Sequence, residues 1–99
     1  MTENPLSTLQ GMDPEFIQHL HDSDEMIFGS GALSKKIKLL IAMAFDAAQG
    51  TEAGVRALAA AAKHEGASKQ EIAEALRVAY HLSGVGSLYT ASAGLKDLF

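Results

Sequence analysis

The chain has 99 residues and a formal net charge of −4, with a sequence pI near 5.4. Its length fits a single domain. The acidic balance excludes the basic patch by which proteins bind nucleic acid or an anionic membrane. Hydrophobic residues make up 47% of the chain, and alanine is the most frequent of them. Because alanine fills little volume, a monomer would have a thin core, and we expect the chain to associate with copies of itself.

The chain contains no cysteine, which excludes a disulfide, a thiolate metal site and a cysteine nucleophile. Its first residues have neither the basic nor the apolar segment of a signal peptide. The longest apolar run, residues 39–45, is far shorter than the ~20 residues that span a bilayer. These features predict a soluble, cytoplasmic protein.

The first predicted helix is identified by the residues at its start. Residues 1–12 read as a loose lead-in, and residues 13–99 as a single helical domain. Asp13 suits an N-cap and Pro14 the first helical position. We expect this first helix to end near Asp22, with one more turn before a glycine-rich stop.

The second and third helices meet at a tight junction. Ser34 is expected to cap a helix that is apolar nearly all round, which predicts burial inside the domain or between subunits. Gly50 suits the position after its end, and Thr51 is expected to cap the next helix. The predicted core stripes of these two helices are Ile37, Leu40, Ile41, Ala44, Phe45 and Ala48, and then Val55, Leu58, Ala59 and Ala62.

Two further helices complete the chain. Ser68 and Glu71 form the pattern of a capping box, followed by an apolar stripe at helical spacing. Residues 87–99 have the spacing of a last helix. Because no alternating pattern or hairpin turn is present, the sequence predicts an all-α fold.

The order and spacing of several short segments carry a resemblance. They are the sequences at residues 38–44, 49–50, 59–76 and 81–86, the last being His-Leu-Ser-Gly-Val-Gly. Together they resemble the carboxymuconolactone decarboxylase superfamily, which includes the AhpD-like alkylhydroperoxidases. The resemblance implies about five to six helices around a central antiparallel helix pair, assembled as trimers or hexamers.

The resemblance also implies a site that this chain has lost. The AhpD-like branch uses a Glu on the buried helix, then Cys-x-x-Cys-x-x-x-His on the next. In this chain the Glu position is Leu39, the two Cys positions are Thr51 and Gly54, and the His position is Leu58. Thiol peroxidase activity by that mechanism is therefore excluded. The decarboxylase branch also has histidine at position 58, so that activity is in doubt as well.

Five residues near the junction remain as candidates for another role. Glu52, His81 and Asp46 carry acid–base groups and are the catalytic candidates. Thr51 and Arg56 are the ligand-binding candidates. Several also have a structural interpretation: Glu52 and His81 suit the dipoles of their helix ends, and Asp46 suits either an ion pair with Arg56 or simple exposure.

No metal site or cofactor is predicted. His19 and His21 are two residues apart, so on a helix they point to different sides, unlike an i, i+4 zinc pair.

Two functions of different classes remain open. One is a non-redox binding or structural protein that forms homo-oligomers. The other is an enzyme that uses a relocated Glu, His or Asp for acid–base chemistry on a small organic acid or lactone. A small organic ligand fits either function, whereas nucleic acid and membrane partners are not expected. An enclosed polar pocket that joins the three acid–base candidates would favour the enzyme, and a junction packed with alanine would not.

Overall fold

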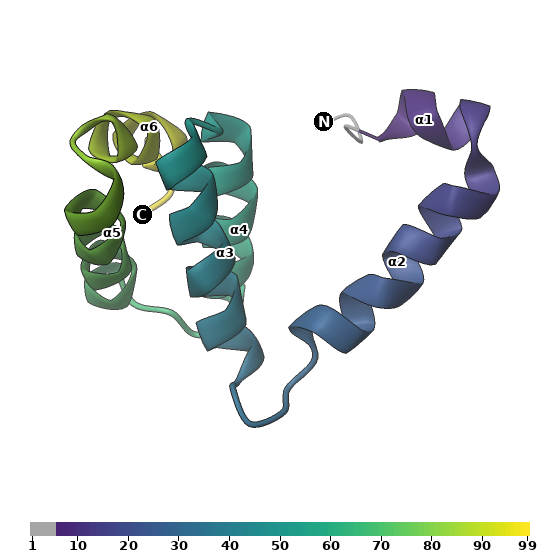
Figure 1. Cartoon of the computed structure of the whole chain (residues 1–99). Coiled ribbons are helices and arrows are strands. Elements are labelled where there is room, and N and C mark those ends of the chain that lie inside the picture. Colours follow the sequence, from purple (N-terminus) through teal and green to yellow (C-terminus); the bar gives the residue numbers. More distant parts are fainter. Residues whose placement is uncertain (1–5) are drawn as a thin grey trace.

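The computed structural model describes residues 6–99, and every regular element in them is an α-helix (Figure 1). The helices are α1 (Ser7–Met12), α2 (Pro14–Phe28), α3 (Lys35–Gln49), α4 (Glu52–His64), α5 (Lys69–Ser83) and α6 (Gly86–Leu95). The predicted all-α fold is confirmed.

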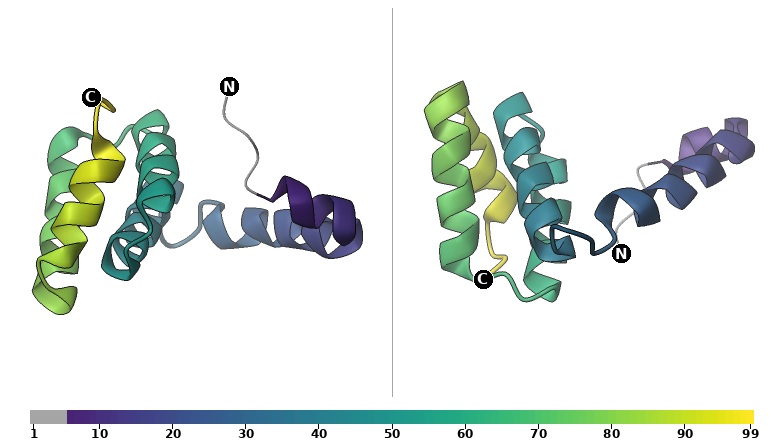
Figure 2. Two further views of the ribbon diagram at one scale, coloured as in Figure 1. Left: turned by 90° about the horizontal axis from the view of Figure 1, so that it is seen from above. Right: turned by 60° about the horizontal axis from the view of Figure 1, so that its bottom comes forward.

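The six helices form two parts. Helices α3 to α6 pack side by side into a body, residues 35–99, whereas α1 and α2 form an arm, residues 6–28, that projects away from it (Figures 1 and 2). The arm meets the body through a small contact between the end of α2 and the first half of α3. Within the arm, Ile17 is the buried residue at 2% exposure.

Helices α3 and α4 are the central antiparallel pair of the body, and a tight turn joins them. Gly50 adopts φ +81°, a left-handed conformation that glycine reaches without strain. The N–H of Thr51 donates to the carbonyl of Asp46 over 2.9 Å. The turn thus satisfies the last carbonyls of α3 and reverses the chain within two residues.

The core lies between α3 and the three helices that follow it. Met43 and Val55 are the largest fully buried side chains. Small residues surround them: Ala47, Ala59, Ala62 and Ala91 are all buried. Gly94 brings α6 against α4, because a Cβ added there would lie 2.9 Å from the carbonyl oxygen of Glu52. The alanines and this glycine allow close packing of the helices.

The core stripe predicted for α3 is only partly correct. Leu40 is buried, but Ile37, Ile41 and Phe45 are exposed in the single chain at 38%, 44% and 64%. The buried positions are instead Leu39, Leu40, Met43 and Ala47. A helix with apolar residues on most of its surface gives no clear choice of inner face from its sequence, and here the neighbouring alanines select the face with Met43.

Three predicted boundaries also differ from the structure. Residues 7–12 form α1 rather than a loose lead-in, whereas residues 1–5 lie outside the described part. Helix α2 continues through Asp22 to Phe28 and ends at Gly29, whose N–H donates to the carbonyl of Glu25 over 2.9 Å. Helix α6 ends at Leu95, since the chain turns at Asp97, whose φ is +62°.

The caps of the helices follow the sequence with one exception. Ser34 caps α3, and Ser68 with Glu71 forms the predicted capping box of α5. Thr51 stands at the N-cap of α4 but its hydroxyl makes no capping hydrogen bond. The serine caps have ψ near 160°, whereas Thr51 has ψ 86°, which turns its side chain away from the first amides of α4.

Candidate functional site

The positions at which the resemblance expects chemistry lie on α3, on α4 and in the turn between them, and none of them holds an acid–base or redox group. Leu39 is buried and Leu58 is half-buried, and both pack in the hydrophobic core. Apolar residues thus stand at the positions where the resemblance expects a carboxylate and an imidazole. Replacing both members of a buried polar pair by apolar residues leaves no unpaired charge in the core.

Asp46 occupies the space beside the second cysteine position. A Cβ built on Gly54 would clash with Oδ2 of Asp46 and would lie 3.1 Å from the methyl of Thr51. The half-buried carboxylate therefore lies against the first turn of α4, where the helix dipole favours a negative charge. Glycine at position 54 is what makes room for it.

Arg56 does not pair with Asp46, and the predicted ion pair between them is not formed. Its guanidinium donates instead to the carbonyls of Gly94 and Lys96, over 3.2 and 2.5 Å. Lys63 makes a similar bond, over 2.7 Å, to the carbonyl of Leu98. These two α4 side chains fasten the C-terminal residues along α4, so Arg56 has a clear structural role.

The two other acid–base candidates lie on the surface. Glu52 is exposed in the first turn of α4, and His81 is exposed in the last turn of α5. Neither makes a side-chain hydrogen bond to Asp46 within residues 6–99. Thr51, proposed with Arg56 for ligand binding, is exposed at the turn. The five candidates thus surround the junction without lining a common cavity.

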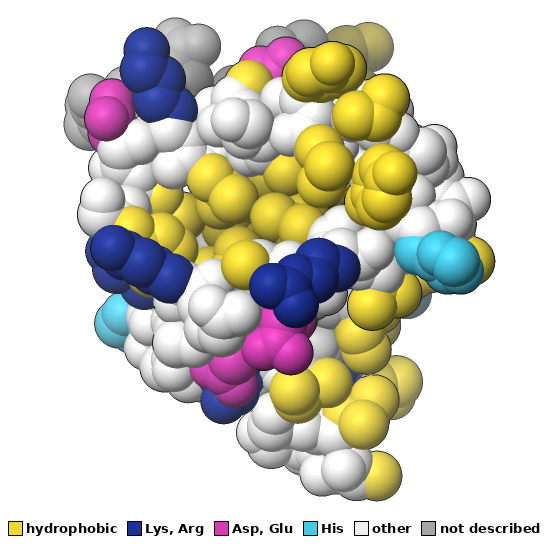
Figure 3. All heavy atoms as spheres, turned by 90° about the vertical axis from the view of Figure 1, so that its left-hand side faces the viewer, with side chains coloured by type: hydrophobic (Ala, Val, Ile, Leu, Met, Phe, Trp, Pro, Cys, Tyr) yellow, Lys and Arg dark blue, Asp and Glu magenta, His cyan; other side chains and the backbone are white. Residues whose placement is uncertain are grey.

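An apolar groove with a volume of about 490 Å³ lies between α3 and α5 (Figure 3). We call it the α3–α5 groove. None of the five candidates lines it. Its lining residues are Ile37, Leu40, Ile41, Ala44, Phe45, Ala48, Ala75, Val78, Ala79, Leu82 and Ser83. The one hydroxyl among them belongs to Ser83 and donates to the carbonyl of Ala79 over 2.7 Å.

Sequence reasoning missed this groove although a signal for it was present. Val78 and Leu82 lie outside the core stripe of α5, one turn apart, and are 60% and 80% exposed. Ile41 and Phe45 repeat the same spacing on α3. Two surface rows of large apolar residues on adjacent helices thus form one apolar face that the described chain leaves exposed.

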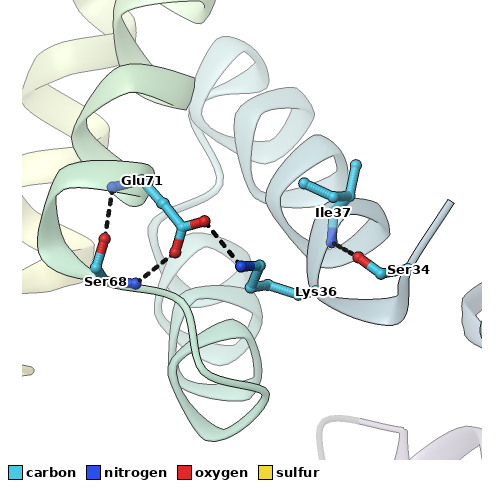
Figure 4. Close-up of polar contacts among 5 residues, drawn as sticks. All are labelled: Ser34, Lys36, Ile37, Ser68 and Glu71. Atoms are coloured by element: carbon cyan, nitrogen blue, oxygen red, sulfur yellow. Dashed lines mark hydrogen bonds and ion pairs between the residues drawn. The ribbon is translucent and has the colours of Figure 1, made fainter.

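A polar cluster ties the two walls of the groove together at one end (Figure 4). Nζ of Lys36, in the first turn of α3, lies 2.8 Å from Oε2 of Glu71, in the first turn of α5. The other carboxylate oxygen accepts from the N–H of Ser68 over 2.9 Å. The Lys36 ammonium first, and the Ser68 N–H second, lower the pKa of Glu71 below its ordinary value of 4.5. The Glu71 carboxylate therefore has a structural role.

The described residues hold no group of three or more His, Asp or Glu placed to bind a metal ion. His19 and His21 both lie exposed on α2. Among the helices of residues 6–99, none is long and apolar enough to cross a membrane.

Comparison with known proteins agrees with the helical body and its junction. The sequence model of the carboxymuconolactone decarboxylase family matches residues 14–97, which include α2 to α6. Neither the curated proteins nor the solved structures gave a match. Since the family match spans most of the sequence, the chain belongs to the carboxymuconolactone decarboxylase family.

Proposed function

We propose that this chain is a non-redox member of its family that works as a homo-oligomeric binding or structural protein. The α3–α5 groove carries the proposal. Its large apolar side chains are more exposed to solvent than is usual on a small monomeric protein, as Phe45 at 64% and Leu82 at 80% illustrate. A contiguous apolar surface of this kind marks a site of interaction.

The junction supports the non-catalytic part of the proposal. Acid–base catalysis needs a positioned group within hydrogen-bond reach of a bound substrate. The groove offers no titratable side chain, and the core beside the junction is packed with alanine and valine. Asp46, the half-buried carboxylate at the junction, lies against Gly54 rather than facing a cavity.

Assembly is tested by sedimentation equilibrium over a range of micromolar concentrations. We expect a species several times the 10.4 kDa mass of one chain, with a trimer or hexamer as the form that the family resemblance favours. A monomer at every concentration would contradict the proposal, since the groove would then face water.

The absence of redox chemistry is tested separately. Purified protein is incubated with an organic hydroperoxide and a dithiol reductant, and peroxide consumption is compared with that of buffer. We expect equal rates, because the positions of the two cysteines hold Thr51 and Gly54. Consumption above the buffer rate that follows protein concentration would overturn this part of the proposal.

A further inference from the structure

The arm has an apolar surface that its own body does not cover. On α2, Phe16 and Ile27 are 58% and 56% exposed and Met26 is 87% exposed. Leu9 and Met12 of α1 add to this surface at 49% and 75%. An amphipathic helix is stabilised mainly by packing its apolar side, so an arm of this composition needs a second surface to cover it.

The arm cannot serve as the cover of its own groove as the chain is arranged. The hollow faces away from the arm, since the view of Figure 3 looks onto the side of the body opposite α2 in Figure 1. The elbow between the two parts is anchored. Phe28 packs against the core, and Nζ of Lys38 donates to the Gly29 carbonyl over 2.7 Å.

The two apolar surfaces are alike in kind and comparable in length. Helices α2, α3 and α5 each have 15 residues, or about 22 Å of helix. The residues that line the groove span 37–48 on α3 and 75–83 on α5, about 18 and 14 Å of helix, so the groove has room for about three turns of α2. A helix laid in a groove contacts it through side chains at i, i+3, i+4 and i+7 spacing, and Phe16, Leu20 and Ile27 of α2 fall on such a row.

Charged side chains are unevenly distributed between the N-terminal segment and the body. All eight lysines and arginines occur from Lys35 onward, whereas six of the twelve acidic residues precede it. The N-terminal segment thus carries only negative charge, and the body has eight basic against six acidic residues. Lys and Arg side chains stand beside the hollow (Figure 3). Opposite charges on two surfaces favour their association and set its orientation.

From these observations we infer that helix α2 of one copy lies in the α3–α5 groove of a second copy. This inference rests on the proposed function, because it assigns the surfaces by which the homo-oligomer forms. The arm of each chain is the ligand of the next, so the exchange closes as a pair or as a ring. The groove is then a binding site for a segment of the same protein.

Assembly of full-length variants tests both surfaces. Ile27→Glu places a charge on the arm and Phe45→Glu places one in the groove. Tyr89→Glu is the control, because Tyr89 is 73% exposed on α6 outside the groove. We expect both test variants to raise the apparent dissociation constant by about tenfold or more, with the control close to wild type, since a charge buried at an interface is costly. Far-ultraviolet circular dichroism checks that each variant stays helical.

Cross-linking tests the contact itself. The chain has no cysteine, so Ile27→Cys and Leu82→Cys variants each carry one thiol and can be mixed and treated with a short bismaleimide. We expect the mixed covalent dimer to form about tenfold faster than that of Ile27→Cys with Ala60→Cys, because docking raises the local concentration. Ala60 lies exposed on α4 outside the groove.

The outcomes separate this inference from the proposed function. A wild-type oligomer that Phe45→Glu dissociates and Ile27→Glu does not, with equal cross-linking of the test and control pairs, would overturn arm exchange and leave the homo-oligomer standing. The groove would then pack against another groove. A wild-type monomer would overturn both. Loss of assembly in both test variants, with the fast cross-link, supports arm exchange.

Discussion

Replacing Met43 by alanine tests how the body is held together. Met43 is fully buried in α3, within a core cluster that contains Ala47, Ala59 and Ala62. The substitution removes about three methylene-sized groups, which amounts to about 2–2.5 kcal/mol of transfer free energy at ~0.8 kcal/mol each. A cavity term adds to this loss unless the surroundings collapse. Alanine side chains have no rotamers with which to fill a void, so we expect a total of about 3–5 kcal/mol.

The assay is urea unfolding followed by circular dichroism, at one protein concentration because assembly adds to apparent stability. Met43→Leu is the matched variant and should lose less than about 1.5 kcal/mol, since it nearly conserves volume. Tyr89→Ala is the surface control at 73% exposure on α6. A loss below about 1.5 kcal/mol for Met43→Ala, at an unchanged m-value, would refute the description of an alanine-walled core that cannot collapse.

Three other predictions concern the junction, the polar cluster and the C-terminal residues. Gly54→Ala should destabilise the wild type but less so in an Asp46→Ala background, with a coupling of about 0.5–3 kcal/mol in a double-mutant cycle measured by urea unfolding. Glu71→Gln should lower the urea midpoint at pH 7. The difference in urea midpoint between this variant and the wild type should shrink below pH 4.5. A carboxylate whose pKa is lower in the folded than in the unfolded chain stabilises the fold above its unfolded-state pKa, and this stabilisation is lost as the pH falls through its folded-state pKa. Arg56→Met should speed carboxypeptidase release of Phe99, because two of the bonds that hold this segment are lost.

Each of these has an outcome that would contradict it. Equal effects of Gly54→Ala in both backgrounds would mean that Asp46 does not occupy the space beside position 54. If the urea midpoints of the wild type and Glu71→Gln differed by the same amount from pH 7 to pH 3, the ion pair with Lys36 would not be the cause of the difference. Unchanged release of Phe99 would show that Arg56 does not hold the C-terminal segment.

The sequence predicted the helices well where the ends carry local signals. The serine caps at 34 and 68, the capping box and the left-handed Gly50 all depend on residues within one turn of the helix end. Such signals can be read from the chain alone. The family resemblance rested on the same local features in order, and the family match confirmed it.

Long-range contacts were less accessible. Arg56 reaches carbonyls about forty residues later in the chain, and no local pattern distinguishes that role from an ion pair with Asp46. The choice of the inner face of α3 likewise depends on which neighbours supply alanine. The groove was missed because Val78 and Leu82 read as isolated surface residues until α3 is placed beside α5.

The contact between Asp46 and Gly54 bears on how readily this chain could regain its family's thiol chemistry. A cysteine placed at position 54 alone would direct its Cβ into the carboxylate oxygen of Asp46. A thiolate there would also stand beside a fixed negative charge, which raises a thiol pKa and weakens the nucleophile. A thiol at position 54 thus requires substitutions on two helices, at Asp46 of α3 and at Gly54 of α4. Positions 46 and 54 are therefore coupled, and a side chain at position 54 requires a smaller residue at position 46.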